Sequence, residues 1–479
     1  MLKFHLLITI LILSTKIYCQ NLTKEQAVED LKYVYSSIQN VHPDLFWYFP
    51  KDSAHAYFND MLSDIEDVID KEDLYLIGSE FLTKFNSTHL VIDMPLLASG
   101  DFSKHSETLN PLPLDLQFTS KGIYVNHDIT GESPIDRGDK IVSINGNDWE
   151  DIFNEFQKIS SSVRNFYAWK FYSRFFLEYY RMQFGDSSSF AFQYIDFDNG
   201  DTLTLVMEAI SFDKWGKHFM LMHDSLTNNV LNFELIDDKK NGIITIKSFA
   251  GSDLPNYESF LKESFGQINE NNVENLIIDI RDNPGGNTKY ADQLINYFSD
   301  EPYQYERKLI CKVSQERRYE INRLTENYSK EEIKDLLKLY NLNWLYDNPI
   351  GDTVVFKGKE LLHYPKQVAH KFKGSVYLLI NERVGSTAHL FAQAFKCNDF
   401  GRVIGQETGE ATIFYGDGCG LTLPNSKLGL GIATKKFVSH CESDHFHGIK
   451  PDYEVDYEPS KLLNGEDKVL DFTIKLITK

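Results

Sequence analysis

The stretch that decides the fold is GSVYLLINERVGSTAHLFAQAFKC, residues 374–397. Its apolar run over 375–380 contains β-branched and aromatic residues, which predicts a buried strand. Apolar residues then recur at helical spacing over 388–395 and predict a helix. Ser386 therefore lies where a strand ends and a helix begins. Free helix N–H groups at such a position can hold an oxyanion beside the hydroxyl.

A second stretch, NLIIDIRDNPGGN over residues 275–287, repeats this arrangement. It predicts a buried strand, a glycine-rich turn and a helix near 290–298. Paired glycines let backbone N–H groups come close to a ligand. Without this stretch, Ser386 would be interpreted only as a helix N-cap.

Together the two stretches resemble the tail-specific, or C-terminal processing, serine peptidases. In that family a strand ends in an Arg-Asn-Asn-Gly-Gly-like turn, and a later strand leads to the segment that carries the nucleophile. GIKPD at 448–452 is similar to the Gly-Val-x-Pro-Asp that the family has near its C-terminus. The resemblance implies that Ser386 is the nucleophile. It also implies that the oxyanion donors are the N–H of Thr387 and that of Gly285 or Gly286.

A serine hydroxyl is a weak nucleophile and needs a base within hydrogen-bond reach. One branch of the family uses a lysine, but the corresponding segment GQETGEAT (405–412) has Ala411 at the lysine position. The tricorn-like branch uses a histidine, and His89 in FNSTHLVI (85–92) matches it. The resemblance therefore implies that His89 is the general base, with Thr88 assisting. On its own, a histidine at the start of a strand would be interpreted as structural.

The acidic residue that orients such a histidine is expected to be Glu442 or Asp444, by analogy with a glutamate in the tricorn-like enzymes. Lys435 and Lys436 are the lysines that would have to reach the site if the base were a lysine. We interpret both as solvated residues of a strand near 430–438.

Metal-ligand residue types crowd into the segment 440–447. Three interpretations are open for it: a metal site, a solvated loop, or the rim of the active site. Its spacing matches no common zinc pattern, so we predict no metal and no cofactor. The residues in question are His440, Cys441, Asp444, His445 and His447.

The chain is predicted to be an α/β multidomain protein. Residues 137–146 resemble the Gly-Asp-x-Ile-x-x-Ile-Asn-Gly segment of PDZ domains, which bind peptides as an added strand or serve only as spacers. The family resemblance implies a crotonase-like (ClpP-like) βα spiral for the catalytic part. The expected divisions are a signal peptide at 1–19, a helical N-terminal region at 20–95 that contributes His89, a PDZ-like β-rich module at 105–212 with a helical insertion at 165–182, and a catalytic domain at 228–479 with an inserted segment at 300–370.

Composition limits the possible partners, and the N-terminal segment indicates the compartment. The net charge of −21 over 479 residues disfavours nucleic acid and anionic lipid as partners. A positive residue and a short apolar core in 1–19 predict a cleaved leader, with lipidation of Cys19 as the less favoured alternative. No later run is apolar enough to span a membrane. We expect a periplasmic or extracellular protein. Its remaining cysteines, at 311, 397, 419 and 441, then form disulfides in one of three connectivities or stay free.

The function predicted from these patterns is an exported serine endopeptidase that acts on polypeptides. Two alternatives remain open. One is a catalytically silent protein that binds peptides or apolar ligands on the same scaffold, which the missing lysine supports. The other is hydrolysis of a small ester or amide. The sequence does not predict an oligomeric state.

Overall fold

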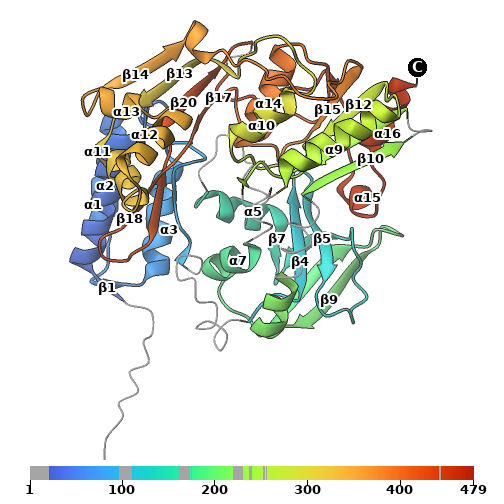
Figure 1. Cartoon of the computed structure of the whole chain (residues 1–479). Coiled ribbons are helices and arrows are strands. Elements are labelled where there is room, and N and C mark those ends of the chain that lie inside the picture. The colour runs from blue at the N-terminus through green and yellow to red at the C-terminus, as the bar shows by residue number, and fades with distance from the viewer. Residues whose placement is uncertain are drawn as a thin grey trace, which may run out of the picture.

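The computed structural model describes residues 21–95, 110–160, 173, 175–219, 230–236, 240–251, 254, 256–441 and 444–478. The predicted leader, Cys19 and Glu442 lie outside these residues, as does part of the predicted helical insertion at 165–182. Among the described residues, no helix is both long enough and apolar enough to cross a membrane. Figure 1 shows the N-terminal helices, a β-rich module and a larger sheet covered by helices.

The larger sheet has six strands, and the two strands that the sequence predicted most clearly lie side by side at its centre. Its first two strands are antiparallel, and every later neighbouring pair is parallel. The strand order is β10 (Leu231–Ile236), β11 (Asn241–Ile246), β12 (Asn275–Asp279), β15 (Ser375–Ile380), β16 (Arg402–Gly405) and β21 (Tyr453–Glu454).

Helices cover both faces of this sheet. On one face lie α9 (Tyr257–Glu270), α10 (Thr288–Ile295) and α14 (Ser386–Cys397). On the other lies α16 (Lys468–Ile477). Leu276 and Ile278 of β12 join the first core, whereas Ile277 joins the second, because successive strand residues point to opposite faces. The strands and helices predicted from residues 275–298 and 374–397 are confirmed.

The N-terminal region is helical, as predicted. It contains α1 (Lys24–Val41), α2 (Lys51–Ser63) and α3 (Lys71–Thr83), and Thr23 and Gln26 form a capping box at the start of α1. Helix α2 ends at Ser63. The chain then forms β2 (Val68–Ile69), which pairs with β1 (Leu22–Thr23).

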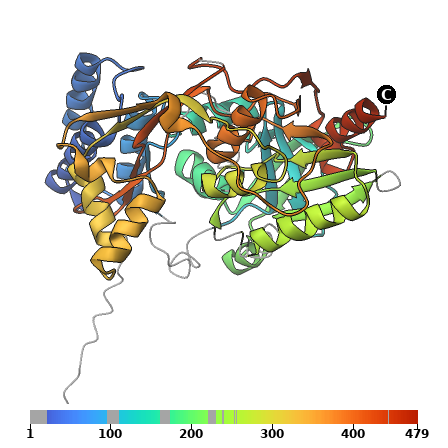
Figure 2. The same ribbon diagram turned by 45° about the horizontal axis from the view of Figure 1, so that its top comes forward.

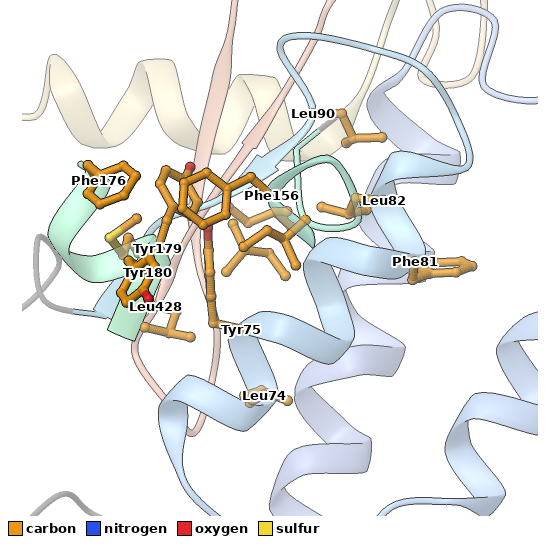
Figure 3. Close-up of a cluster of buried hydrophobic side chains, with 14 of the residues drawn as sticks. Leu74, Tyr75, Phe81, Leu82, Leu90, Phe156, Phe176, Tyr179, Tyr180 and Leu428 are labelled. Carbon is orange, nitrogen blue, oxygen red and sulfur yellow. The ribbon is translucent and has the colours of Figure 1, made fainter. Parts of the chain in front are cut away.

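The β-rich module has the strand order β4-β5-β6-β8-β9, with β7 paired to β6. Its helices share a core with the N-terminal region. Figure 3 shows Phe156, Phe176 and Tyr179 of the module gathered near Tyr75 of α3. The PDZ assignment itself stays a prediction. The elements are β4 (Leu114–Thr119), β5 (Gly122–Asp128), β6 (Lys140–Ile144), β7 (Asn147–Asp148), α5 (Trp149–Gln157), α7 (Phe176–Phe184), β8 (Ser189–Ile195) and β9 (Thr202–Glu208).

The segment 300–370, predicted as an insertion, contributes two strands to a four-stranded sheet, in the order β14-β13-β20-β17. Its first helix, α11, lies against α1 of the N-terminal region (Figure 2), where Asn40 Nδ2 donates to Glu316 Oε1 at 2.8 Å. The elements are β13 (Glu306–Lys312), α11 (Gln315–Leu324), α12 (Lys330–Leu339), α13 (Trp344–Asp347), β14 (Thr353–Lys357) and the 3-10 helix η3 (Gly358–Leu361), which join β17 (Ile413–Gly416) and β20 (Lys435–Ser439).

Candidate active site

Ser386 is the first residue of α14 and has a left-handed backbone. Its φ of +47° is uncommon for a residue that carries a Cβ. Its N–H donates to Glu410 Oε2, which holds this conformation from outside the helix. Backbone strain of this kind persists only where the surroundings enforce it, and it is concentrated at functional sites.

The turn after β12 lies directly against Ser386. Asn283 is fully buried; its side chain donates to Ile246 O at 3.0 Å and accepts from Gly285 N at 2.9 Å. A Cβ at Gly285 would lie 2.6 Å from Ser386 Cβ and 2.7 Å from Thr387 N. The φ of Gly285 is also +105°. Only glycine fits this position without moving the nucleophile.

The turn after β12 also bears on whether Gly285 or Gly286 supplies an N–H group to an oxyanion hole. The N–H of Gly285 is already bonded to Asn283 Oδ1. Thr387 Oγ1 donates to Gly286 O at 2.6 Å, so these two residues lie side by side. The geometry therefore favours Gly286 over Gly285 as the partner of Thr387 in an oxyanion hole.

His89 reaches the site through pairing between distant segments. It lies two residues before β3 (Val91–Ile92), which pairs with β19 (Gly429–Ile432) beside β18 (Cys419–Thr422). The turn before His89 is held by a contact between Ser87 Oγ and His42 Nε2, which lie 3.3 Å apart. Burial lowers the pKa of His42 to about 3, so His42 is a neutral structural residue.

Glu410 joins the two halves of the site. Its Oε1 accepts from Thr88 Oγ1 at 2.9 Å and lies 3.8 Å from His89 Nδ1. Its other oxygen accepts the N–H of Ser386. The side chain is only 1% exposed. Burial raises the pKa of Glu410, against the opposing effects of His89, the Ser386 N–H and Thr88.

Glu410 was not among the acidic residues expected from the sequence, although it lies next to Ala411 in the segment 405–412. The signal was an acidic residue beside the position of the missing lysine. Asp444, one of the two acids expected there, instead caps its own turn: its Oδ1 accepts from Phe446 N at 2.6 Å and from His447 N at 3.3 Å. Glu410 makes the contact with His89 that was expected of Asp444 or Glu442.

The interpretation of Lys435 and Lys436 as solvated was wrong. On β20 the Lys435 side chain is only 20% exposed and the Lys436 side chain only 7%, and the Lys436 ammonium lies 4.4 Å from the Trp47 ring centroid. Lys435 Nζ lies 3.0 Å from Asp417, and this ion pair outweighs burial and raises the pKa of Lys435. Lys436 Nζ lies 2.5 Å from Asp44. Charged, ion-paired lysines are unsuited to act as the base.

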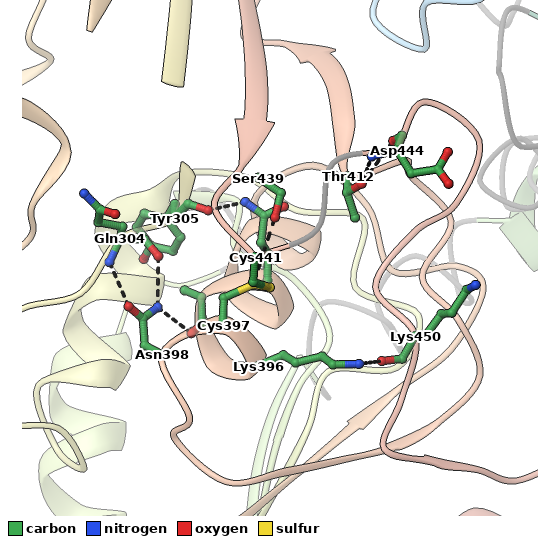
Figure 4. Close-up of a disulfide and its surroundings, with 12 residues drawn as sticks. Gln304, Tyr305, Lys396, Cys397, Asn398, Thr412, Ser439, Cys441, Asp444 and Lys450 are labelled. Carbon is green, nitrogen blue, oxygen red and sulfur yellow. Dashed lines mark hydrogen bonds between the residues drawn. A yellow bond between two sulfur atoms is a disulfide. The ribbon is translucent and has the colours of Figure 1, made fainter. Parts of the chain in front are cut away.

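The histidine-rich segment that follows β20 is linked covalently to α14, the helix that begins at Ser386. A disulfide joins Cys441 to Cys397 at the end of α14 (Figure 4), while Cys311 and Cys419 are free and buried. Cys441 is therefore not a metal ligand in this state. Nowhere in the described part of the chain do three candidate metal ligands gather. His445 stacks on Trp47 at 4.4 Å, a position that fits the interpretation as an active-site rim.

Comparison with known proteins matches part of the chain to one family. Residues 240–455 match the model described as "Peptidase family S41". The Tricorn protease of Thermoplasma acidophilum is 26% identical over 213 residues, covering 43% of this chain and 14% of that protein. A putative Tricorn-like protease C-terminal subunit of Sulfurisphaera tokodaii is 30% identical over 127 residues, covering 24% of this chain and 14% of that protein. Both matches thus span only a small part of the relative.

Among solved structures, mature CPAF complexed with lactacystin has a similar fold, with a TM-score of 0.67 and 16% identity. The match covers 95% of this chain and 98% of that one. The resemblance therefore extends beyond the segment that the family model matches, to the N-terminal helices and the β-rich module.

Proposed function

Residues 240–455 of this chain belong to peptidase family S41, and from that premise we propose that the protein is an exported serine endopeptidase that forms an acyl-enzyme on Ser386. The observation that carries the proposal is the buried carboxylate of Glu410, which contacts the Ser386 N–H, Thr88 and His89. Its substrates are polypeptides, the substrate class of a peptidase family. The mechanism uses side chains and backbone groups only.

His89 is the general base. Its Nδ1 faces Thr88 and Glu410, which favours the tautomer with a proton on Nδ1 and leaves Nε2 on the opposite side of the ring. Nε2 takes the proton of Ser386 Oγ as that oxygen attacks the peptide carbonyl carbon. The same proton then passes to the leaving amine as the C–N bond breaks. A water molecule, activated in the same way, hydrolyses the acyl-enzyme.

Glu410 stabilises the protonated imidazole that forms during attack, because an ionised carboxylate 3.8 Å from Nδ1 favours the charged ring. It also holds the strained backbone of Ser386. The N–H groups of Thr387 and Gly286 stabilise the oxyanion of the tetrahedral intermediate. These assignments replace Glu442 and Asp444 as the acid and Gly285 as a donor.

The β-rich module recruits polypeptide or gates its access. Its hairpin touches the turn that precedes the nucleophile, where Ser120 Oγ donates to Glu382 Oε1 at 3.5 Å. Lys121 Nζ also lies 2.7 Å from Asp456. A peptide bound to this module would therefore act close to Ser386.

Export is supported by the disulfide between Cys397 and Cys441, because disulfides persist in oxidising compartments. The leader predicted at 1–19 agrees with this compartment. We assign the protein to the periplasm or the extracellular space on these two grounds.

The test is cleavage of casein by the chain from Gln20 onward, beside its Ser386→Ala variant. A fluorophosphonate probe, which labels activated serines, is applied to both. Ser329→Ala is the matched control, because Ser329 caps the exposed helix α12 far along the chain from the site. Cleavage and labelling that disappear only in Ser386→Ala support the proposal. Absence of both from the unsubstituted chain overturns it in favour of a binding protein.

A further inference from the structure

The disulfide lies at the opposite end of α14 from the nucleophile. Ser386 is the first residue of this helix and Cys397 is the last. Cys441 is exposed and Cys397 is partly exposed. A thiol or disulfide in solution can therefore reach this bond, whereas the free thiols of Cys311 and Cys419 are buried.

The segment that follows Cys441 is bonded to the loop that carries Glu410 (Figure 4). Asp444 N donates to Thr412 Oγ1 at 2.7 Å, and Thr412 Oγ1 donates to Asp444 O at 3.0 Å. Thr412 N also donates to His447 O at 2.9 Å. Residues 444–447 thus hold the loop on the C-terminal side of Glu410.

The same segment holds the loop on the N-terminal side of Glu410. Thr408 N donates to Ile449 O at 3.1 Å, and Ile449 N donates to Thr408 Oγ1 at 2.8 Å. A Cβ at Gly448 would lie 2.3 Å from Thr408 O and 2.6 Å from Glu410 O, so the two backbones are in contact. Residues 444–449 therefore position the backbone of Glu410 from both sides.

These contacts and the disulfide connect Glu410 to the nucleophile in a closed path. The path runs along α14 to the disulfide, through residues 444–449 to Glu410, and back to the Ser386 N–H, which Glu410 accepts. Cys397 and Cys441 are 44 residues apart, and Glu410 lies inside the loop that they close. A disulfide restricts the conformational freedom of the loop it closes.

The segment has little core packing of its own. Among its described residues, 441 and 444–447, none is buried. Segments with few buried contacts open locally at low cost in free energy. Its hold on Glu410 therefore depends on the covalent bond at Cys441.

We propose that the Cys397–Cys441 disulfide is a positioning element for Glu410, so that the active site is complete only when this bond has formed. The inference rests on the proposed function, because it assigns the regulation of the same site. The two thiols lose two electrons and two protons to a disulfide-bearing oxidant, which becomes a dithiol, and a dithiol reductant reverses the exchange. Since disulfides form in oxidising compartments, the peptidase becomes active after export.

The test compares kcat for casein cleavage by the oxidised chain and by the chain reduced with dithiothreitol. Reduction should lower kcat by about tenfold, because displacement of a group that acts in the transition state slows the chemical step. Removal of the reductant and reoxidation should restore kcat. An equal kcat in the two states overturns the inference.

Glu410→Gln separates positioning of Glu410 from a general effect on stability. In this variant reduction should change kcat by less than about twofold, because the group that the disulfide positions is already replaced. A loss of about tenfold in both backgrounds would show that the disulfide acts independently of Glu410, which also overturns the inference.

Cysteine variants supply the controls. The double variant Cys397→Ser with Cys441→Ser should behave like the reduced chain and should not respond to dithiothreitol. Cys311→Ala, which removes a buried free thiol, should keep the activity of the unsubstituted chain and its response to the reductant. Full kcat in the folded double variant contradicts the proposal.

Hydrogen exchange tests the coupling without catalysis. The N–H groups of Thr408 and Thr412 are bonded to residues 447–449, so a peptide spanning 405–415 should exchange faster after reduction. Equal exchange in the two states overturns the coupling. If neither state cleaves casein or reacts with a fluorophosphonate, the proposed function fails, while the exchange rates still decide whether the disulfide positions this loop.

Discussion

The two halves of the candidate active site are built in different ways. Ser386 belongs to a continuous strand, turn and helix, and the Gly285 turn packs against it within van der Waals distance. His89 instead precedes a strand of two residues, and its side chain is 24% exposed. Its position depends on the pairing of β3 with β19. Ser386 is positioned by its own helix and turn, whereas His89 is placed by the assembly of two distant regions.

The largest effect should come from His89→Ala. Loss of the general base should lower kcat/KM by about 10³-fold. The melting temperature should change little, because a partly exposed side chain contributes little to the core. Steady-state kinetics and a thermal melt check both statements. His55→Ala, at an exposed position of α2, is the matched control and should keep full activity. Full activity in His89→Ala would remove this residue from the mechanism.

The next largest effect should come from Gly285→Ala, which tests the half of the site that is built around Ser386. The added Cβ would meet Ser386 Cβ at 2.6 Å, and the displaced turn should lower kcat by about 10²-fold, the typical cost of losing an oxyanion donor. Gly131→Ala is the control, because φ at Gly131 is +70° but its Cβ would meet open space. Both variants carry the backbone cost, but only Gly285→Ala should lose activity. Equal kcat in the two folded variants would contradict this account.

A smaller effect is expected from Glu410→Gln, which changes the side chain that contacts both Ser386 and His89. Replacing a charged hydrogen-bond partner by a neutral one should lower kcat by about tenfold to a hundredfold. Unchanged kcat would show that Glu410 is not part of the mechanism.

The same variant should lose activity but gain stability, relative to the unsubstituted chain, as the pH rises. Because burial raises the pKa of Glu410, the folded state holds this proton more tightly than the unfolded state. The resulting stability is present at acidic pH and is lost as the pH rises through the raised pKa. Glutamine does not ionise, so the melting temperature of the variant relative to the unsubstituted chain should be higher at pH 8 than at pH 5. A pH-independent difference would contradict the burial of an ionisable Glu410.

The sequence alone predicted the elements whose signals are local. The runs at 275–280 and 375–380 are strands, because continuous apolar segments next to glycine-rich turns are buried on both faces of a parallel sheet. The capping box of Thr23 and Gln26 at the start of α1 is likewise a local pattern of neighbouring residues. Ser386 was found for the same reason, since the end of a strand and the start of a helix are visible in adjacent residues.

Only the tertiary structure decided which acid lies beside His89 and whether the lysines are solvated. Glu410 and Asp444 are both acidic residues in loops, and no local pattern separates a carboxylate bonded to the Ser386 N–H from one that caps its own turn. A lysine is usually exposed, but Lys436 is buried because its side chain packs against the rings of Trp47 and Tyr415. Burial and partner choice depend on residues far away in the chain, brought together by strand pairing, and for that reason the sequence did not determine them.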